Sequence, residues 1–519
     1  MRKLVFISVP GLRRIDVERL PELRAMTSSG GMATLTSGFP AVTCPVQSNM
    51  TTGVRPDQHG IVANGLYLKN VDKVDLELRL ESKLSGAKLF GNIVSSCNFD
   101  PEIKQPVWPK SENLPYIEMW TSPNSAVESP QIWDVLRGKQ DNTYQRQFRI
   151  RRRKSINTGL PIFQSVRINR NSRVNKLKSA VWFALLSKFC LADYVCNFAP
   201  IHNPDGSESL WCYTRPYLFY GGLRDKLGHF PVQGYWGPLA GQSASEWIVD
   251  SAIIGANKFK PDYFYVYVPR LDYTPQKFGA NASELSADLA DLNKLFVKLR
   301  AGFTEALGCE PTWLIAGEYA VTDVSSVVYP NRILREMGLL SIEERNGQEY
   351  LLPSKSRCFA LCDHQFSHIH FNDADPQLMQ RVADKFRNES GIDEVLVGDE
   401  RAKYNLTHRR SGEIILISEP DSWQAYYFWN DDSKVPEYAR KVDIHRKPGY
   451  DPVELFFDRE TMSVPLDANL IRGSHGAPAR DNSQKTVVLA SKPELLADKK
   501  QFDDIDMFNI VNQFFKGKV

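Results

Sequence analysis

A short stretch near the N-terminus carries a hydroxyl group that could act as a nucleophile. Thr43 lies between Pro40 and Pro45, in a segment rich in small polar residues that follows neither a helical nor a strand pattern. The prolines restrict the backbone on both sides of Thr43, and Pro45 suits the first turn of a helix. A threonine at a helix N-terminus can face an anion such as a phosphate. The alternative is a polar loop in which Thr43 only caps the helix.

Two carboxylates could join this hydroxyl at one site. Asp272 and Glu318 each follow an apolar run of strand length, and Pro10 follows the first such run, residues 3–9. In parallel sheets, ligands bind beyond the carboxyl ends of the strands. The layout therefore predicts a site where these strand ends meet.

The elements that must position these residues alternate along the chain. The pattern predicts strands at 3–9, 262–268 and 312–316, and helices at 20–28, 244–258 and 283–306. This rhythm is typical of an α/β protein whose mostly parallel sheet is covered by helices on both faces.

The pattern changes between residues 331 and 398. Short helices and strands, with a hairpin at Asn346-Gly347, replace the strand–helix rhythm there. We therefore predict an inserted α+β subdomain at 331–398, with 1–330 and 399–519 forming the α/β core.

The composition is that of a globular protein. The 519 residues are 42% hydrophobic and 24% charged, and no apolar run approaches the roughly 18 residues that span a membrane. The first apolar run is too short for a signal peptide, and the eight cysteines show no CxxC pair. These features predict a cytoplasmic protein with buried thiols and no transmembrane segment.

A basic segment, residues 142–178, stands out from a net charge of only +3. It holds no acidic residue and the following cations: Arg146, Arg149, Arg151, Arg152, Arg153, Lys154, Arg167, Arg170, Arg173, Lys176 and Lys178. Such a run could bind nucleic acid or another anionic surface. It lacks a nucleic-acid fold signature, so we favour a solvated, partly disordered insertion.

Four segments resemble motifs of the alkaline phosphatase superfamily, in its nucleotide pyrophosphatase/type I phosphodiesterase branch. They are Phe39-Pro-Ala-Val-Thr43, Pro56-Asp-Gln-His-Gly-Ile-Val-Ala-Asn64, Leu271-Asp-Tyr273 and Gly473-Ser-His-Gly476. The resemblance covers most of the chain apart from the basic segment, and it implies an alkaline-phosphatase-like α/β sandwich. It also implies that Thr43 attacks phosphorus while Asn64 holds a phosphate oxygen. Two divalent ions, usually zinc, would activate the hydroxyl and spread the charge of the transferring phosphoryl group.

The chain departs from the family pattern at three ligand positions. Pro10 replaces an Asp, Gln276 replaces the His of an Asp-x-x-x-His pair, and Tyr319 replaces the His of an Asp-His pair. Zinc takes about four ligands, so neither implied metal site is complete.

The retained residues divide between the two implied sites. One site would hold Asp272 and His475, with Gln276 as a weak oxygen ligand. The other would hold Thr43 and Glu318, with Tyr319 beside them.

Two further polar clusters could complete the site. Asp363 and His364 lie in Cys362-Asp-His-Gln365, and His445, Arg446 and Lys447 lie in a second cluster that ends at Tyr450. Similar segments occur in a bacterial subgroup of the superfamily that the chain resembles. The resemblance implies that Asp363, His364 and His445 could complete a rebuilt metal site, His445 as a ligand or as a supporting residue, with Arg446 and Lys447 binding the phosphate. The alternative for Asp363 and His364 is a locally hydrogen-bonded pair.

The resemblance thus predicts a metal-dependent hydrolase. Its substrate would be a small phosphodiester or pyrophosphate, or else a phosphomonoester, and its cofactor one or two ions of zinc or manganese. The alternative is a catalytically degenerate family member that binds a phosphorylated ligand or a protein partner.

Overall fold

The computed structural model describes residues 2–69, 116–120, 122–137, 177–199, 201–202, 208–373, 375–497 and 499–518. Residues 142–176 of the basic segment lie outside these ranges, so its binding to nucleic acid or an anionic surface stays a prediction.

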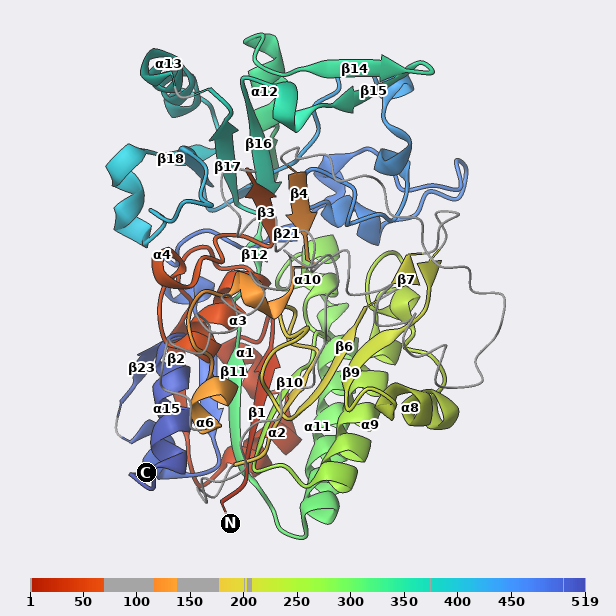
Figure 1. The fold of residues 1–519 in the computed structure, drawn as a ribbon, viewed down its shortest axis with the longest axis vertical. Coiled ribbons are helices and arrows are strands. Elements are labelled where there is room, and N and C mark those ends of the chain that lie inside the picture. Colours follow the sequence, from red (N-terminus) through yellow and green to blue (C-terminus); the bar gives the residue numbers. More distant parts are fainter. Residues whose placement is uncertain are drawn as a thin grey trace, which may run out of the picture.

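A nine-stranded sheet forms the core of the molecule (Figure 1). In spatial order its strands are β23 (Gln501–Asp503), β2 (Met32–Thr36), β22 (Thr486–Ala490), β11 (Thr312–Gly317), β1 (Leu4–Val9), β10 (Tyr263–Tyr267), β5 (Ser179–Trp182), β6 (Tyr194–Phe198) and β9 (Cys212–Arg215). The five strands from β11 to β6 are parallel to one another. This confirms the predicted mostly parallel sheet, whose central strands are apolar because both faces are covered.

The register of the three central strands positions the site. Ser8 of β1 is level with Tyr267 of β10 and with Ala316 of β11. The loops that carry Asp272 and Glu318 therefore leave the same edge of the sheet, as the sequence predicts.

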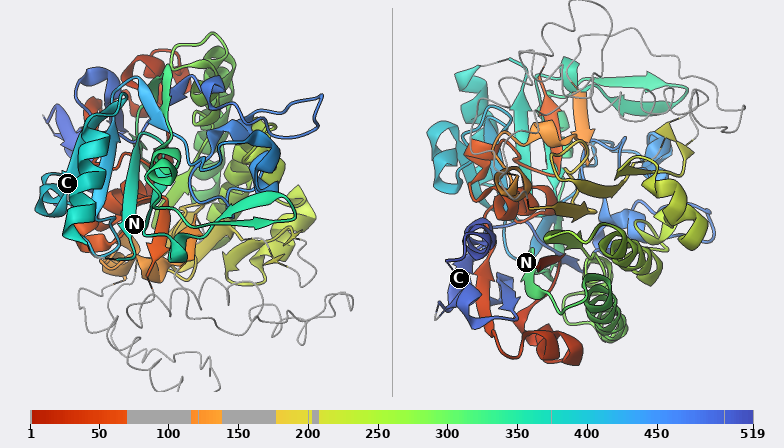
Figure 2. Two further views of the ribbon diagram at one scale, coloured as in Figure 1. Left: turned by 90° about the horizontal axis from the view of Figure 1, so that it is seen from above. Right: turned by 60° about the horizontal axis from the view of Figure 1, so that its bottom comes forward.

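Helices cover the sheet in two groups. On one face α11 (Leu285–Leu307) packs against α9 (Gln242–Phe259) and α2 (Pro21–Thr27). On the other, α15 (Asp506–Phe515) packs against α3 (Thr43–Thr52) and α6 (Ile132–Leu136), as the two views of Figure 2 show. The remaining α-helices in the described ranges are α1 (Arg14–Val17), α4 (Pro56–His59), α8 (Phe219–Leu227), α10 (Tyr273–Phe278), α12 (Pro330–Glu336), α13 (Pro376–Arg387) and α14 (Pro493–Leu496).

A second, antiparallel sheet lies above the carboxyl edge of the first (Figure 1). Its strands, in order, are β16 (Cys358–Asp363), β17 (Phe366–Phe371), β19 (Ile414–Ser418) and β18 (Ile392–Val397). The hairpin of β14 (Ile342–Arg345) and β15 (Gln348–Leu351) turns at Asn346-Gly347, as predicted. Strand β19 lies beyond residue 398, and the proposed division into core and insertion stays a prediction.

Short strand pairs connect the two sheets. The pair formed by β12 (Thr322–Asp323) and β21 (Gly473–Ser474) returns the chain to the loop after β11, so that His475 lies near Glu318. The others are β3 (Gly65–Leu68) with β4 (Tyr116–Met119), β13 (Ser326–Val328) with β20 (Ser422–Gln424), and β7 (Ile201–His202) with β8 (Glu208–Ser209).

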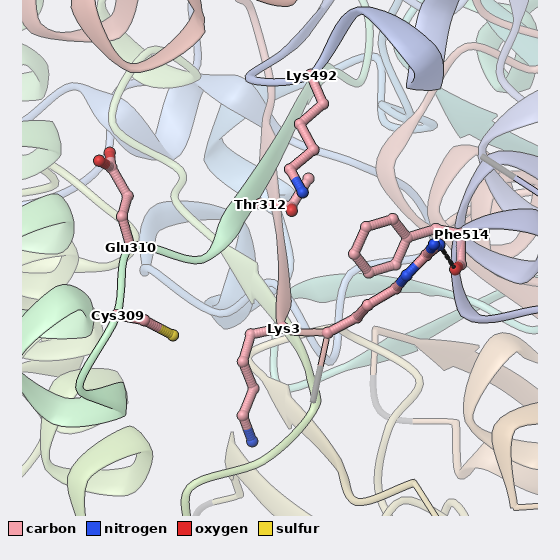
Figure 3. Close-up of a pocket in the computed structure, with 7 residues that line it drawn as sticks. Lys3, Cys309, Glu310, Thr312, Lys492 and Phe514 are labelled. Atoms are coloured by element: carbon pink, nitrogen blue, oxygen red, sulfur yellow. Dashed lines mark hydrogen bonds between the residues drawn. The ribbon is translucent and has the colours of Figure 1, made fainter. Parts of the chain in front are cut away.

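A surface pocket of about 440 Å³ lies at the opposite end of the large sheet. It is lined by Arg2, Lys3, Cys309, Glu310, Thr312, Lys492 and Phe514 (Figure 3). These residues surround the amino ends of β1 and β11, whereas the candidate residues follow their carboxyl ends. The pocket is therefore separate from the predicted site.

None of the helices in the described ranges is long and apolar enough to cross a membrane.

Candidate active site

Thr43 is the first residue of α3, a helix that lies between the large sheet and the smaller one (Figure 1). Val42 before it is extended, and Pro45 falls in the first helical turn, as predicted. The side chain of Thr43 is only 3% exposed. The hydroxyl therefore lies at a helix N-terminus, where the helix dipole and backbone N–H groups favour negative charge.

The hydroxyl of Thr43 is connected to Asp272 through a phenol. Thr43 Oγ1 lies 3.0 Å from the Tyr319 hydroxyl, and that hydroxyl donates to Asp272 Oδ1 at 3.0 Å. Burial raises the pKa of Asp272 to about 7, although Tyr319 and Gln276 act to lower it. Burial and the two nearby carboxylates also raise the pKa of Tyr319 well above its usual value.

Glu318 lies next to the hydrogen-bonded series of Thr43, Tyr319 and Asp272, and it is completely buried. Its Oε1 accepts hydrogen bonds from Ser8 at 2.6 Å and from Gln47 at 2.9 Å. Its Oε2 has no hydrogen-bond partner among the described residues. Burial raises the pKa of this carboxyl to about 8, against the opposing effect of the two hydrogen bonds.

Asn64 is fixed by Asp363 from the smaller sheet. The backbone N–H and side-chain amide of Asn64 donate to the two oxygens of Asp363 at 2.8 and 3.1 Å. Asn64 Oδ1 accepts from the N–H of Cys44, in the first turn of α3. The motif residues Thr43 and Asn64 are thus brought together, as predicted.

Asp363 and His364 form a local pair, which was the alternative to metal ligation. His364 Nδ1 lies 2.6 Å from Asp363 Oδ1. Burial raises the pKa of Asp363 to about 6 and lowers that of His364 well below its usual value.

A row of aromatic rings joins the two sides of the site. Tyr319 stacks on His475 and His364 stacks on Tyr450, each with ring centroids 3.7 Å apart. His475 and His364 lie between them with centroids 3.9 Å apart and planes tilted by 43°. The Tyr450 hydroxyl donates to Gln276 at 2.7 Å, and Gln276 donates to the carbonyl of Asp272 at 2.9 Å. The predicted residues Asp272, Gln276, Tyr319, His364 and His475 therefore form one connected cluster.

The two ring nitrogens of His475 differ in their hydrogen bonding. Its Nδ1 donates to the carbonyl of Ala41 at 2.8 Å, whereas its buried Nε2 has no hydrogen-bond partner in the part of the chain that the structure describes. Burial, reinforced by His364, lowers the pKa of His475 well below its usual value, so the ring is neutral.

The cluster does not fit the metal ions that the resemblance implies. The described ranges contain no group of three or more His, Cys, Asp or Glu side chains able to hold a metal. Both oxygens of Asp363 accept hydrogen bonds, and Asp272 Oδ1 accepts from Tyr319. Among the predicted ligands, the buried atoms without a hydrogen-bond partner are His475 Nε2 and Glu318 Oε2. Zinc requires about four ligands.

In the cluster that ends at Tyr450, the charged groups of Arg446 and Lys447 pair with carboxylates and do not contact Thr43. The ammonium of Lys447 is fully buried and pairs with Asp451 and Glu454, both at 2.7 Å. Arg446 is exposed and pairs with Glu437, and His445 Nδ1 lies 3.2 Å from the carbonyl of Met119. Of this cluster, Tyr450 is the residue that reaches the ring stack.

The sequence did not indicate a role for three residues that support the site. Ser8 is the penultimate residue of β1, and Gln47 follows Thr43 by one helical turn, so both spacings could have indicated that they face the site. Tyr450 belongs to a segment that was recognised only for its charged residues.

Comparison with known proteins identifies the family of the chain. The family model of type I phosphodiesterase/nucleotide pyrophosphatase matches residues 4–451. The chain therefore belongs to this family, whose general chemistry is the hydrolysis of phosphoester bonds. No curated protein matches the chain significantly.

Solved structures show the fold. Phosphonoacetate hydrolase from Sinorhizobium meliloti 1021, in complex with phosphonoacetate, is 14% identical, with a TM-score of 0.53 over 98% of this chain and 95% of that one. Murine ectonucleotide pyrophosphatase/phosphodiesterase 5 is 13% identical, with a TM-score of 0.53 over 99% and 95%. The fold is alkaline-phosphatase-like, as the motifs predict.

Proposed function

We propose that the protein hydrolyses phosphodiester or pyrophosphate bonds with Thr43 as the nucleophile. The observation that carries the proposal is the position of the Thr43 hydroxyl, which lies at the N-terminus of α3 and is hydrogen-bonded to Tyr319. A phosphomonoester would fit the same chemistry. The substrate is a small phosphorylated molecule, and the cytoplasmic location remains a prediction.

Asn64 supports this role through its remaining hydrogen-bonding capacity. A side-chain amide has two N–H donors, and one of them is directed at Asp363. The second can donate to a non-bridging oxygen of a phosphoryl group held next to α3. The helix N-terminus stabilises the same negative charge.

The reaction would take two displacements. Thr43 Oγ forms a bond to phosphorus as the bond from phosphorus to the leaving-group oxygen breaks. Water then attacks the phosphothreonine and releases Thr43. In this proposal neither displacement involves a metal ion. The predicted dependence on zinc or manganese is tested in the assay below.

The assay uses p-nitrophenyl phosphodiesters, p-nitrophenyl phosphate and a dinucleotide pyrophosphate, each with Zn²⁺, with Mn²⁺ and with a chelator. We expect turnover of a diester or a pyrophosphate that Thr43→Ala abolishes and Thr43→Ser partly retains. Thr52→Ala is the matched control, because Thr52 is buried in the same helix and its hydroxyl bonds only Ser48 and Val54 among the described residues. An active Thr43→Ala variant excludes Thr43 as the nucleophile.

A catalytically degenerate protein that binds a phosphorylated ligand is the second candidate. It is favoured by Pro10, Gln276 and Tyr319 at the family's ligand positions, and by the lack of a three-ligand group in the described ranges. This candidate predicts calorimetric binding of a nucleoside monophosphate or inorganic phosphate without turnover under any metal condition.

A further inference from the structure

The fate of the Thr43 proton identifies a further residue of the site. A threonine hydroxyl becomes an effective nucleophile only when its proton leaves as the new bond to phosphorus forms. In the described ranges, the hydrogen-bonding partner of Thr43 Oγ1 is the Tyr319 hydroxyl, at 3.0 Å. The proton therefore has a neighbouring oxygen that can accept it.

The direction of the hydrogen bonds follows from Asp272. In its ionised form the Asp272 carboxylate can only accept, so the phenol of Tyr319 then directs its own proton at Asp272 Oδ1, 3.0 Å away. The lone pairs of the phenol oxygen then face Thr43, whose hydroxyl donates to it. Both distances lie within the range of O–H···O hydrogen bonds. The three groups form a continuous path from the nucleophile to a carboxylate.

The surroundings hold this path in place. The ring of Tyr319 is buried and stacks on His475 with an interplanar angle of 7°. Gln276 donates to the backbone carbonyl of Asp272, and Tyr450 fixes Gln276 in turn. Both partners of Asp272 come from positions where the family pattern has histidine.

We propose that Tyr319 is a catalytic residue that takes the proton of Thr43 while it passes its own proton to Asp272. The inference rests on the proposed function. As Thr43 Oγ bonds to phosphorus, the Thr43 proton moves to the phenol oxygen, the phenol proton moves to Asp272 Oδ1, and the leaving group departs with its electron pair. When the oxygen of water later bonds to phosphorus, the bond from phosphorus to Thr43 Oγ breaks, the proton on Asp272 returns through the phenol to Thr43 Oγ, and the proton of the attacking water stays with the released phosphate.

The test compares Tyr319→Phe with the wild-type enzyme on its best substrate. The variant keeps the ring and its stacking but lacks the hydroxyl. We expect kcat to fall by about 10²–10⁴-fold with KM changed little. Tyr263→Phe is the control, since Tyr263 is buried in β10 and its hydroxyl has no hydrogen-bond partner within the described ranges. The kcat of this variant should equal that of the wild type.

A proton inventory separates proton transfer from a structural role. In mixtures of H₂O and D₂O, the kcat of the wild type should depend on the deuterium fraction along a curve that requires two moving protons. Tyr319→Phe should lose this curvature. Asp272→Asn, which cannot take up the proton, should reproduce both the loss of rate and the loss of curvature.

The failures of the two proposals differ. If Thr43→Ala is inactive but Tyr319→Phe keeps kcat within twofold and the wild-type inventory, the relay is wrong and the nucleophile stands. Activity that appears only with added Zn²⁺ or Mn²⁺ and is unchanged in Tyr319→Phe also overturns the relay. A wild type that hydrolyses none of the substrates overturns both proposals.

Discussion

Replacement of Lys447 distinguishes a structural role from the phosphate-binding role predicted from sequence. Its ammonium, Asp451 and Glu454 are at most 1% exposed, and both ion-pair distances are 2.7 Å. Burial acts to lower the pKa of Lys447, but the two carboxylates raise it above its usual value, so the lysine is charged. Lys447→Met keeps the length of the side chain and leaves two buried carboxylates without their cation.

The expected loss of stability is large. Removing one partner of a buried ion pair lowers the free energy of unfolding by about 3–5 kcal/mol. Here Trp236 and the N–H of Asp443 still donate to Glu454, which places the expected loss at the lower end. The loss should be smaller at acidic pH, where a carboxyl can take up a proton.

Denaturant unfolding of the full-length protein measures this effect. Lys434→Met is the control, because its pair with Glu344 is exposed on both sides and should contribute less than about 1 kcal/mol. If Lys447→Met is as stable as the wild type but has a raised KM, Lys447 serves the ligand and the structural reasoning is refuted.

Three further predictions concern the surroundings of the site. Burial lowers the pKa of His59 from 6.5 to about 3, so the contribution of the neutral ring to the free energy of unfolding is full above pH 6.5 and falls as the pH drops towards 3. Between pH 7.5 and 5.5 the wild type should lose roughly 1–1.5 kcal/mol of unfolding free energy relative to His59→Gln, as measured by denaturant titration. If the difference between the two proteins does not change with pH, this prediction is wrong. Gly317→Ala should lower the melting temperature by several degrees, because the new Cβ would lie 1.6 Å from Thr486 Oγ1 and 2.7 Å from the carbonyl of Leu12. Gly308→Ala is the control: its Cβ would meet no neighbour within 4 Å, and only the positive φ of residue 308 strains it. Because the predicted ligands form no three-donor group, elemental analysis should find less than one zinc per chain and a chelator should not change the melting temperature; stoichiometric zinc would contradict the geometry.

The sequence predicted the elements whose patterns are local. The apolar runs of β1, β10 and β11 and the long amphipathic α11 could be placed within two residues of their observed ends. Strands β2 and β22 were not predicted, since their pairing is set by residues far apart in the sequence. The motif residues Thr43, Asn64, Asp272 and His475 lie together because they follow strand ends or sit on the loops that meet there.

Side-chain pairing could not be predicted in the same way. Asp363 next to His364 in sequence fits both a metal site and a hydrogen-bonded pair, and only the position of Asn64 shows that both carboxylate oxygens are occupied. Lys447 was grouped with Arg446 by adjacency. Neighbours in an irregular segment can face opposite environments, and here one is buried and the other exposed.

Two of the three replaced ligand positions, Gln276 and Tyr319, hold residues that contact Asp272. Gln276 and Tyr319 stand where the family pattern has histidines, and both hydrogen-bond to Asp272. A buried carboxylate without a cation is unstable unless donors surround it or it takes up a proton. Because burial outweighs these donors, the pKa of Asp272 rises to about 7, where the group exchanges protons near neutrality. Of the two substitutions, Tyr319 places a hydroxyl between Thr43 and Asp272, and in the proposed relay that carboxylate accepts the proton.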